Sequence, residues 1–204
     1  MKKTRILATG DFHGSSFLAE KLAKNAEEEQ VDLVIICGDI THFGQECQNV
    51  IRPFMQRQKK VLFVPGNHDP INMADFLAEF YGVKNLHGYS ITHNNIGIFG
   101  CGGAENLGPV NALSEDEMLY TIKKAHKGIE NLERKILVTH MHPSNSKVEK
   151  LSGFSGSKAI RKAITEHKPE LLLCCHIHEL EGIEEMIENT KVINVGRSGK
   201  IIEF

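Results

Sequence analysis

The sequence predicts an α/β fold for its 204 residues, and three observations support this prediction. Short apolar runs of strand length alternate with amphipathic segments of helix length through the first part of the chain. The composition, with 41% hydrophobic and 25% charged residues, is that of an ordinary globular protein. The chain contains no internal repeat, linker or low-complexity segment, and its length suits one domain over residues 1–204. We therefore expect parallel strands joined by right-handed crossovers.

The N-terminal elements follow from apolar runs and from residues that start or stop helices. Ser15 or Ser16 can cap a helix whose apolar residues share one face, and Pro53 interrupts the next helical segment. The expected order is a strand over residues 5–8, a helix from 15 or 16 to about 29, a strand over 31–37, a helix over 45–58 that bends or restarts at its proline, and a strand over 61–64.

The C-terminal part is expected to begin with a hairpin, because two short apolar runs flank a His-Asn-Asn turn. Ser114 and Glu117 form the capping-box pattern at the start of a helix. In order, we expect hairpin strands over 89–92 and 96–100, a Gly-rich loop over 101–109, a helix over 115–126, a strand over 135–139, a loop over 141–156, a helix over 157–167, a strand over 171–175, and short strands near 182–184, 191–195 and 200–202.

Charge and cysteine content limit the setting in which the protein acts. The net charge of −2 provides no global attraction to nucleic acid or anionic lipid, although a local patch could still bind either. The five scattered cysteines do not form a disulfide framework. No apolar run approaches the ~20 residues that span a bilayer, and the N-terminal apolar run is too short for a signal peptide. We expect a cytoplasmic protein with no membrane partner.

Polar clusters follow the expected strands, and their residue types are those of metal ligands. The carboxyl ends of parallel strands meet at one edge of a sheet, so distant clusters can build one site there. Oxygen and imidazole ligands of this kind suit divalent transition metals. The clusters, in chain order, are Gly10-Asp11-Phe12-His13-Gly14, Gly38-Asp39, Gly66-Asn67-His68-Asp69, His140 and His176-Ile177-His178.

The spacing within the clusters restricts which residues can share an ion. Side chains two residues apart on an extended segment point the same way, so Asp11 and His13 can face one ion. The Asp39 carboxylate has two oxygens and can bridge two cations, whereas adjacent residues such as Asn67 and His68 project differently. Taken alone, Asp11 could equally be a turn aspartate and His13 a surface histidine.

Two positions leave alternatives open. By spacing alone, either His140 or His142 could be the ligand after the strand over 135–139. Cys175 directly precedes His176, and its side chain could crowd the turn or be tolerated there. The loops over 100–114 and 141–156 are rich in Gly, Ser and Asn, and we expect them to form mobile, wet pocket walls.

The ordered set D-x-H, GD, GNHD, H and H-x-H, from Asp11 to His178, resembles the calcineurin-like metallophosphoesterase family. The resemblance implies a four-layer αββα sandwich, in which two mixed sheets are flanked by helices. It also implies two divalent metal ions per chain, with Mn, Fe or Zn as the expected metals. By resemblance, metal one takes Asp11, His13, Asp39 and His178, and metal two takes Asp39, Asn67, His140 and His176.

The resemblance further implies a phosphoesterase that acts on a small phosphoester or nucleotide. A hydroxide bridging the metals would attack phosphorus, and His68 would protonate the leaving oxygen as general acid. We expect phosphodiesters to be favoured over monoesters, because the ligand clusters contain no Arg or Lys to bind the second charge of a monoester. The alternative is an inactive scaffold of the same fold, which should have lost ligands; here every position is filled. The exposed hairpins are compatible with a homodimer.

Two residues depart from the family pattern. Cys175 stands where the family usually has Gly, and we expect the backbone there to accommodate it without ligation. His42 stands where the related Ser/Thr phosphatases have an Asp that orients the catalytic His. Either Asp69 or a backbone carbonyl would then orient His68, or His68 would be less finely tuned.

Overall fold

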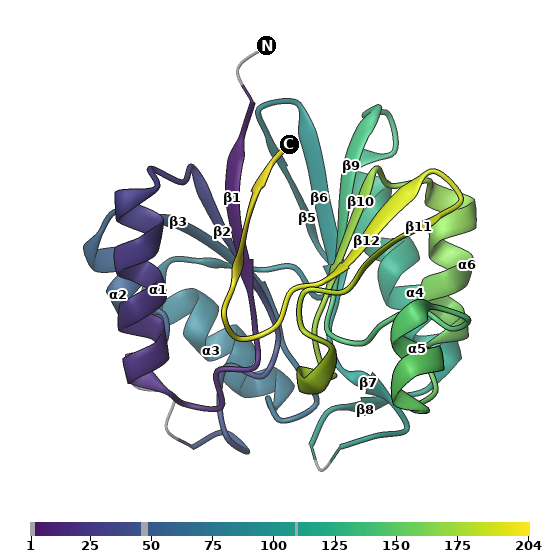
Figure 1. Cartoon of the computed structure of the whole chain (residues 1–204), viewed down its shortest axis with the longest axis horizontal. Coiled ribbons are helices and arrows are strands. Elements are labelled where there is room, and N and C mark those ends of the chain that lie inside the picture. The colour runs from purple at the N-terminus through teal and green to yellow at the C-terminus, as the bar shows by residue number, and fades with distance from the viewer. Residues whose placement is uncertain (1–2, 46–48, 109) are drawn as a thin grey trace.

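A computed structural model describes residues 3–45, 49–108 and 110–204, and it shows two facing sheets between outer layers of helices (Figure 1). Each sheet is mixed, because antiparallel strands join a parallel centre. The four layers agree with the architecture that the resemblance implied. Both sheets direct the carboxyl ends of their parallel strands towards the lower end of the molecule in Figure 1.

The first sheet has the strand order β13-β1-β2-β3-β4. Its first four strands in sequence are parallel neighbours, and the C-terminal strand returns antiparallel to β1 at one edge. The chain termini therefore lie side by side on adjacent strands. The strands are β1 (Arg5–Thr9), β2 (Leu33–Cys37), β3 (Lys60–Val64), β4 (Lys84–Asn85) and β13 (Lys200–Glu203).

The second sheet has the strand order β11-β12-β10-β9-β6-β5, and a small two-stranded sheet, β7-β8, lies apart from it. Its four central strands are parallel, and the two edge strands are antiparallel. The strands are β5 (Ser90–His93), β6 (Ile96–Cys101), β7 (Ala104–Glu105), β8 (Ala112–Leu113), β9 (Arg134–Thr139), β10 (Leu171–Cys174), β11 (Glu184–Ile187) and β12 (Thr190–Asn194).

Helices cover the outer face of each sheet. The first group packs on sheet one and the second on sheet two, as the composition of the two outer apolar clusters shows. The first group is α1 (Ser16–Glu28), α2 (Arg52–Gln56) and α3 (Ile71–Tyr81); the second is α4 (Glu115–His126) and α6 (Lys158–His167). Shorter elements are α5 (Lys147–Ser152) and the 3₁₀ turns η1 (Lys127–Ile129) and η2 (His178–Leu180).

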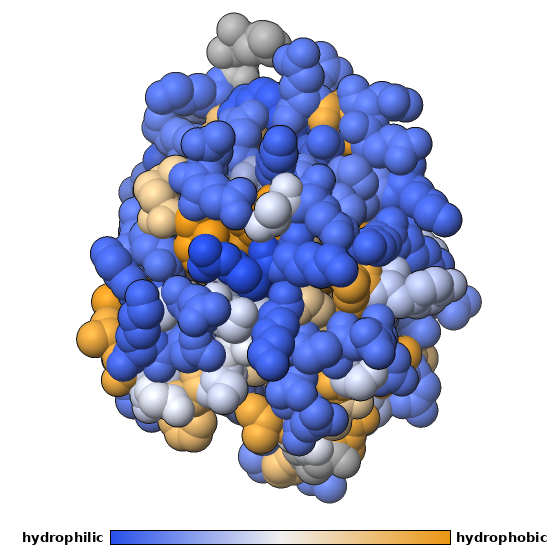
Figure 2. Space-filling model, turned by 90° about the vertical axis from the view of Figure 1, so that its right-hand side faces the viewer, coloured by the Kyte–Doolittle hydropathy of each residue, from blue (hydrophilic) through white to orange (hydrophobic). Residues whose placement is uncertain are grey.

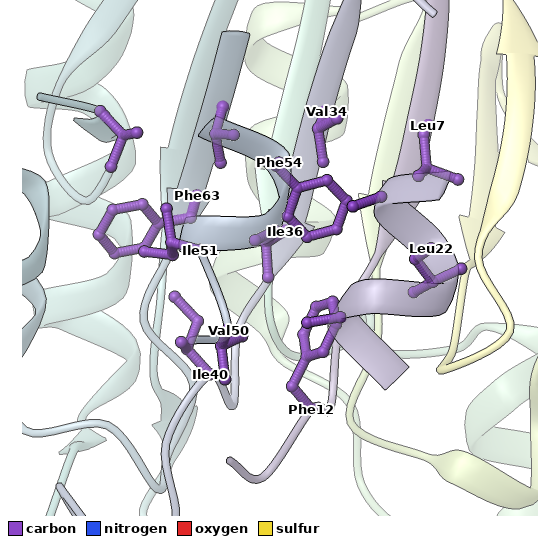
Figure 3. Packing of buried hydrophobic residues seen from close by; sticks show 14 of the residues in the cluster. Leu7, Phe12, Leu22, Val34, Ile36, Ile40, Val50, Ile51, Phe54 and Phe63 are labelled. Carbon is purple, nitrogen blue, oxygen red and sulfur yellow. The ribbon is translucent and has the colours of Figure 1, made fainter. Parts of the chain in front are cut away.

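Three apolar layers explain why the central strands are continuous apolar runs. On β2, Leu33 and Ile35 pack between the two sheets, whereas Val34 and Ile36 pack beneath the helices. Figure 3 shows the second kind of contact, where Phe54 of α2 lies over the strand residues of sheet one. A strand buried on both faces has no polar side to alternate with its apolar side. The apolar layer between the sheets holds them face to face, so that their polar clusters lie at the same edge.

Several predicted elements need correction. The helix over 45–58 is present only as α2, which starts with Pro53 in its first turn, and residues 46–48 lie outside the described residues. Helix α3 was not predicted, because its N-cap is Pro70, which offers no side-chain cap. Helix α5 lies within the predicted loop over 141–156. The Ser-x-x-Glu pattern of Ser146 and Glu149 could have indicated it, since the Ser146 hydroxyl accepts the Glu149 N–H.

Other local predictions are confirmed. The Ser114 and Glu117 capping box forms at the start of α4, and Ser15 caps α1 through the N–H of Leu18.

The cysteines at positions 37, 174 and 175 are buried and free. Across the described parts of the chain, no helix combines the length and apolarity needed to cross a bilayer.

Candidate metal centre

The structure brings together the seven predicted ligands at the carboxyl ends of five strands, three from sheet one and two from sheet two. Each polar cluster begins where its strand ends, so the parallel arrangement places all of them at one edge. Figure 1 shows this edge at the lower end of the molecule, where the loops of both sheets approach one another. Sheet one contributes Asp11, His13, Asp39 and Asn67, and sheet two contributes His140, His176 and His178.

Asp39 lies at the centre of the cluster. Its Oδ2 is 3.6 Å from His13 Nε2 and 3.5 Å from His140 Nε2, so one oxygen faces imidazoles from both sheets. Its Oδ1 accepts the backbone N–H of His68 at 2.9 Å, which fixes the orientation of the carboxylate. The side chain is almost completely buried. A buried carboxylate oxygen between two imidazoles has the arrangement that a bridging ligand requires.

Asp11 forms the second anionic position. Its Oδ2 is 3.4 Å from His178 Nε2 and accepts the backbone N–H of His176 at 3.2 Å. Burial alone would raise the pKa of Asp11, but the hydrogen bond from His178 and the charge of His140 outweigh it and lower the pKa to about 2. Its Oδ1 is buried without a hydrogen-bond partner among the described residues. An ionised, unpaired oxygen at this depth is expected where a cation completes the site.

His140 connects Asn67 to His176. Its Nδ1 donates to the carbonyl of Cys37 at 2.8 Å, which directs Nε2 into the site. Nε2 is 2.8 Å from Asn67 Oδ1 and 3.2 Å from His176 Nδ1. Burial opposes a charge on His140, yet Asp39 and Asp11 outweigh it and raise its pKa. Positive charge is therefore favoured between these atoms, and a bound cation would supply it in place of a proton.

His176 and the cysteine before it behave differently. Burial first, and then the positive charge of His140, lowers the pKa of His176 to about 3, so its imidazole is neutral and can act as a ligand. Burial and the charge of Asp11 raise the pKa of the Cys175 thiol well above its usual value. Without a bound metal ion the thiol is therefore protonated, and its exclusion from the ligand set stays a prediction.

The backbone turns sharply at four of the candidate ligands. Asp11, His13, Asp39 and His176 have φ values of 53°, 45°, 50° and 75°, in the left-handed region that residues other than Gly rarely adopt. Such strain persists only where the surrounding structure enforces it, and it gathers at functional sites. Gly66 lets the Asp39 carboxylate lie close to the backbone after β3, because a Cβ at this position would overlap the carboxylate.

Asp69 holds the site together from behind. Its carboxylate accepts the N–H groups of Ile40 and Thr41, the Thr41 hydroxyl and the N–H of Gly66, at 2.7–3.0 Å. These bonds join the turn after β2 to the turn after β3. Sequence reasoning missed this function, because the partners of Asp69 in the first of these turns lie about 30 residues away along the chain and only the fold brings them near.

Comparisons with known proteins agree with this geometry. A family model described as calcineurin-like phosphoesterase matches residues 4–180. The chain belongs to the calcineurin-like phosphoesterase family. The uncharacterized protein MJ1162 of Methanocaldococcus jannaschii is 32% identical over 203 residues, which cover 95% of this chain and 88% of that protein.

Solved structures show the same fold at low identity. TT1561 of Thermus thermophilus has a TM-score of 0.79 and 19% identity, covering 97% of this chain and 91% of its own. A dimetal phosphatase from Danio rerio has a TM-score of 0.66 and 13% identity, covering 95% of this chain and 88% of its own. At these identities the likeness establishes the fold alone.

In this calcineurin-like chain, His68 is oriented by packing. Its ring centroid is 4.6 Å from that of Phe43, 4.9 Å from that of His13 and 6.0 Å from that of His42. Its buried Nδ1 has no hydrogen-bond partner among the described residues. Orientation by Asp69 or by a backbone carbonyl is therefore not observed among the described residues, which leaves the third alternative, a less finely tuned His68. The Asp69 carboxylate is occupied by the two turns, and the His42 ring stacks near that of His68.

The Cys175 side chain fits against Gly10 because Gly10 has no side chain. A Cβ on Gly10 would lie 2.6 Å from the Cys175 Sγ, so the glycine of the first cluster makes room for the thiol. His142, the alternative to His140, is buried, and its Nε2 lies 3.2 Å from the carbonyl of Phe154. It holds the loop before α6.

A cavity of about 370 Å³ opens beside the candidate ligands of this family member. Asn67, His176 and His178 line it on one side, and the remaining walls are Leu107, Gly108, Phe154, Ile177 and Glu179. Leu107 and Phe154 add apolar surface to the loops expected to form wet walls, and both side chains stay open to water. Of the apolar side chains in these loops, those of Leu107 and Phe154 face the cavity.

Proposed function

We propose that this chain is a dinuclear-metal-dependent phosphoesterase that hydrolyses small phosphodiesters or nucleotides. The observation that carries the proposal is the position of Asp39 Oδ2, which lies between His13 Nε2 and His140 Nε2 at nearly equal distances. Two groups of ligands that share one carboxylate oxygen suit a pair of metal ions. Asp11, His13, Asp39 and His178 would hold one ion, and Asp39, Asn67, His140 and His176 the other.

The residues present fit such ions in number and type. Carboxylate, amide and imidazole ligands suit Mn, Fe or Zn. When bound, two cations lower the pKa of a water nucleophile and neutralise charge on the phosphoryl oxygens. The chain itself excludes bulk water with the buried side chains of Asp11, Asp39 and His140, and it holds Asp11 ionised at neutral pH.

We propose His68 as the general acid. Its Nδ1 is buried, so Nε2 is the nitrogen available to a substrate at the half-exposed edge of the ring. The contacts with Phe43 and His13 hold the ring beside the candidate ligands without using that edge for a hydrogen bond. A proton on Nε2 would pass to the leaving oxygen as its bond to phosphorus breaks.

The preference for diesters follows from the charges near the site. None of the side chains that line the cavity in the described chain is Lys or Arg, so the second charge of a monoester lacks a cationic partner there. Arg197 is the cation to test, because its charge acts on His178 and opposes the rise in that residue's pKa.

Free, buried thiols are consistent with action in the reducing cytoplasm.

The alternative function is a scaffold of the same fold with weak or no catalysis. A scaffold should have lost some ligands or let the site collapse. Here all seven candidate residues converge at one edge of the two sheets. This arrangement favours the enzyme over the scaffold.

The deciding experiment combines metal analysis with hydrolysis of matched aryl esters. We expect two ions per chain, loss of activity on chelation and its return with Mn. With one metal and a shared nitrophenol leaving group, kcat/KM should be at least as high for the diester as for the monoester. Fully metallated protein that is inert on every ester would refute the enzyme. A monoester preference above about tenfold that disappears in Arg197→Ala would instead assign Arg197 as a phosphate ligand.

A further inference from the structure

We propose that the cavity beside the metal centre binds the ester group that stays on phosphorus, and that this group is flat, uncharged and largely apolar, with a hydrogen-bond donor at its edge. The proposal rests on the phosphoesterase function above and names its substrate class. Three candidate ligands, Asn67, His176 and His178, form one wall of the cavity. A phosphoryl group held by them therefore directs one of its substituents into this space.

The leaving group occupies a different surface. It must reach His68, whose ring packs against His13, His42 and Phe43. None of these four residues lines the cavity in the described structure. A substrate that uses both surfaces needs two substituents on phosphorus, so the cavity itself favours a diester.

Two apolar side chains face this space while remaining open to water. Phe154 is 58% exposed and Leu107 is 43% exposed, although both line the cavity. A flat ring between them would cover apolar surface and gain stacking against Phe154. The volume of about 370 Å³ lies within the range of small-molecule sites. Figure 2 shows polar groups over most of the face on the side of α5 and α6, with apolar groups mainly in its lower half.

The Phe154 wall is held in position by its backbone. Its carbonyl accepts a hydrogen bond from His142 Nε2 at 3.2 Å, and its N–H donates to the Ser152 hydroxyl at 3.1 Å. His142 is itself completely buried, so this anchor is part of the protein interior. The aromatic ring is thus presented to the cavity by a fixed loop.

The charge of the cavity walls limits which retained ester groups can bind. Glu179 is the one charged residue other than histidine among the cavity walls in the described chain. A carboxylate at this position repels a second phosphate and accepts a hydrogen bond from an N–H or O–H. Nucleobases and hydroxylated or amino-substituted aryl groups share this chemistry.

The test compares phosphodiesters that share p-nitrophenol as the leaving group and differ in the retained group. With Mn bound, we expect kcat/KM to be about tenfold higher for the phenyl ester than for the methyl ester, the scale of one aromatic contact. Phe154→Ala should remove most of this ratio, chiefly by lowering kcat/KM for the phenyl ester. The matched control is Leu151→Ala, an equally exposed apolar residue that does not line the cavity. It should keep the ratio.

A second arm separates the pocket from catalysis. Phenyl(methyl)phosphinate and dimethylphosphinate carry one charge and no ester bond, so calorimetry measures their binding to the Mn-loaded protein whether or not it hydrolyses anything. We expect the phenyl compound to bind about tenfold more tightly, and Phe154→Ala and Leu107→Ala each to reduce that preference. Binding preference without hydrolysis would refute the phosphoesterase and keep the pocket. Equal binding of both phosphinates, or a preference unchanged in both variants, would overturn the pocket assignment.

The thymidine p-nitrophenyl ester tests whether the group is a nucleobase with a hydrogen-bond donor at its edge. If a nucleobase is the natural group, the thymidine ester should exceed the phenyl ester, and Glu179→Gln should lower kcat/KM for thymidine more than for phenyl. A higher rate for the phenyl ester, with Glu179→Gln affecting neither, would remove the hydrogen-bond donor from the proposal. Melting curves confirm that each variant is folded.

Discussion

The two sheets contribute different chemistry to the same site. The turns of sheet one supply both carboxylates and the amide, with Asp39 at the centre, whereas the turns of sheet two supply imidazoles alone. Three of the four left-handed ligand residues also belong to sheet one. Sheet one therefore sets the negative charge and the bridging oxygen, and sheet two completes the coordination with neutral or weakly basic groups. Neither half forms the site without the other.

Loss of the shared oxygen should have the largest effect. Asp39→Asn replaces the carboxylate that faces imidazoles from both sheets, and we expect a fall in kcat/KM of at least about 10³-fold with loss of both metal ions. His178→Ala, from sheet two, should chiefly deplete one ion. Metal content by mass spectrometry and steady-state rates measure both effects. Equal loss of a single ion in the two variants would contradict the bridging role of Asp39.

His68 should affect catalysis without affecting metal content. His68→Ala should retain both ions and lower kcat by roughly 10²–10⁴-fold, the usual weight of a general acid. The loss should shrink for nitrophenyl esters, whose leaving group needs no proton. The matched control is His42→Ala, which removes the neighbouring ring and should have the smaller effect on kcat. Release of metal from His68→Ala would make this residue a ligand and would require a new role for Asn67.

Asp69, from sheet one, should contribute to the stability of the fold without binding a metal ion. Asp69→Asn puts an amide N–H₂ where one oxygen accepts hydrogen bonds, and we expect a loss of about 2–3 kcal/mol in the free energy of unfolding. The buried turns after β2 and β3 depend on those bonds. Urea unfolding measures the change, and the exposed Asp75→Asn should stay within about 0.5 kcal/mol of the wild type. A wild-type midpoint for Asp69→Asn would show that the turns hold without it.

The smallest effect should come from the outer layer over sheet two. His126 and His167, at the ends of α4 and α6, stack with ring centroids 4.1 Å apart. Burial, and then the charge of His126, lowers the pKa of His167 from 6.5 to about 4. The unfolded chain binds this proton more tightly, so stability is full above pH 6.5 and falls as the pH drops towards 4.

His167→Phe keeps an aromatic ring and removes the titration. Its melting temperature should therefore fall less than that of the wild type between about pH 7 and about pH 4.5. Parallel melting curves at both values measure the difference. An identical pH dependence in the two proteins would assign the effect to other groups.

The order of the polar clusters, the apolar runs before them and the capping serines were legible in the sequence, because they depend on neighbours a few residues away. The family resemblance carried by that order implied the ligand set, and parallel strands explain why those residues meet at one edge. The orientation of His68 by packing, the use of Asp69 to join two turns and the space that Gly10 leaves for Cys175 were decided by tertiary structure. Each depends on atoms that are distant in sequence and become neighbours only when the chain folds. The apolar walls of the cavity have the same cause, because loop composition does not say which side chains face inward.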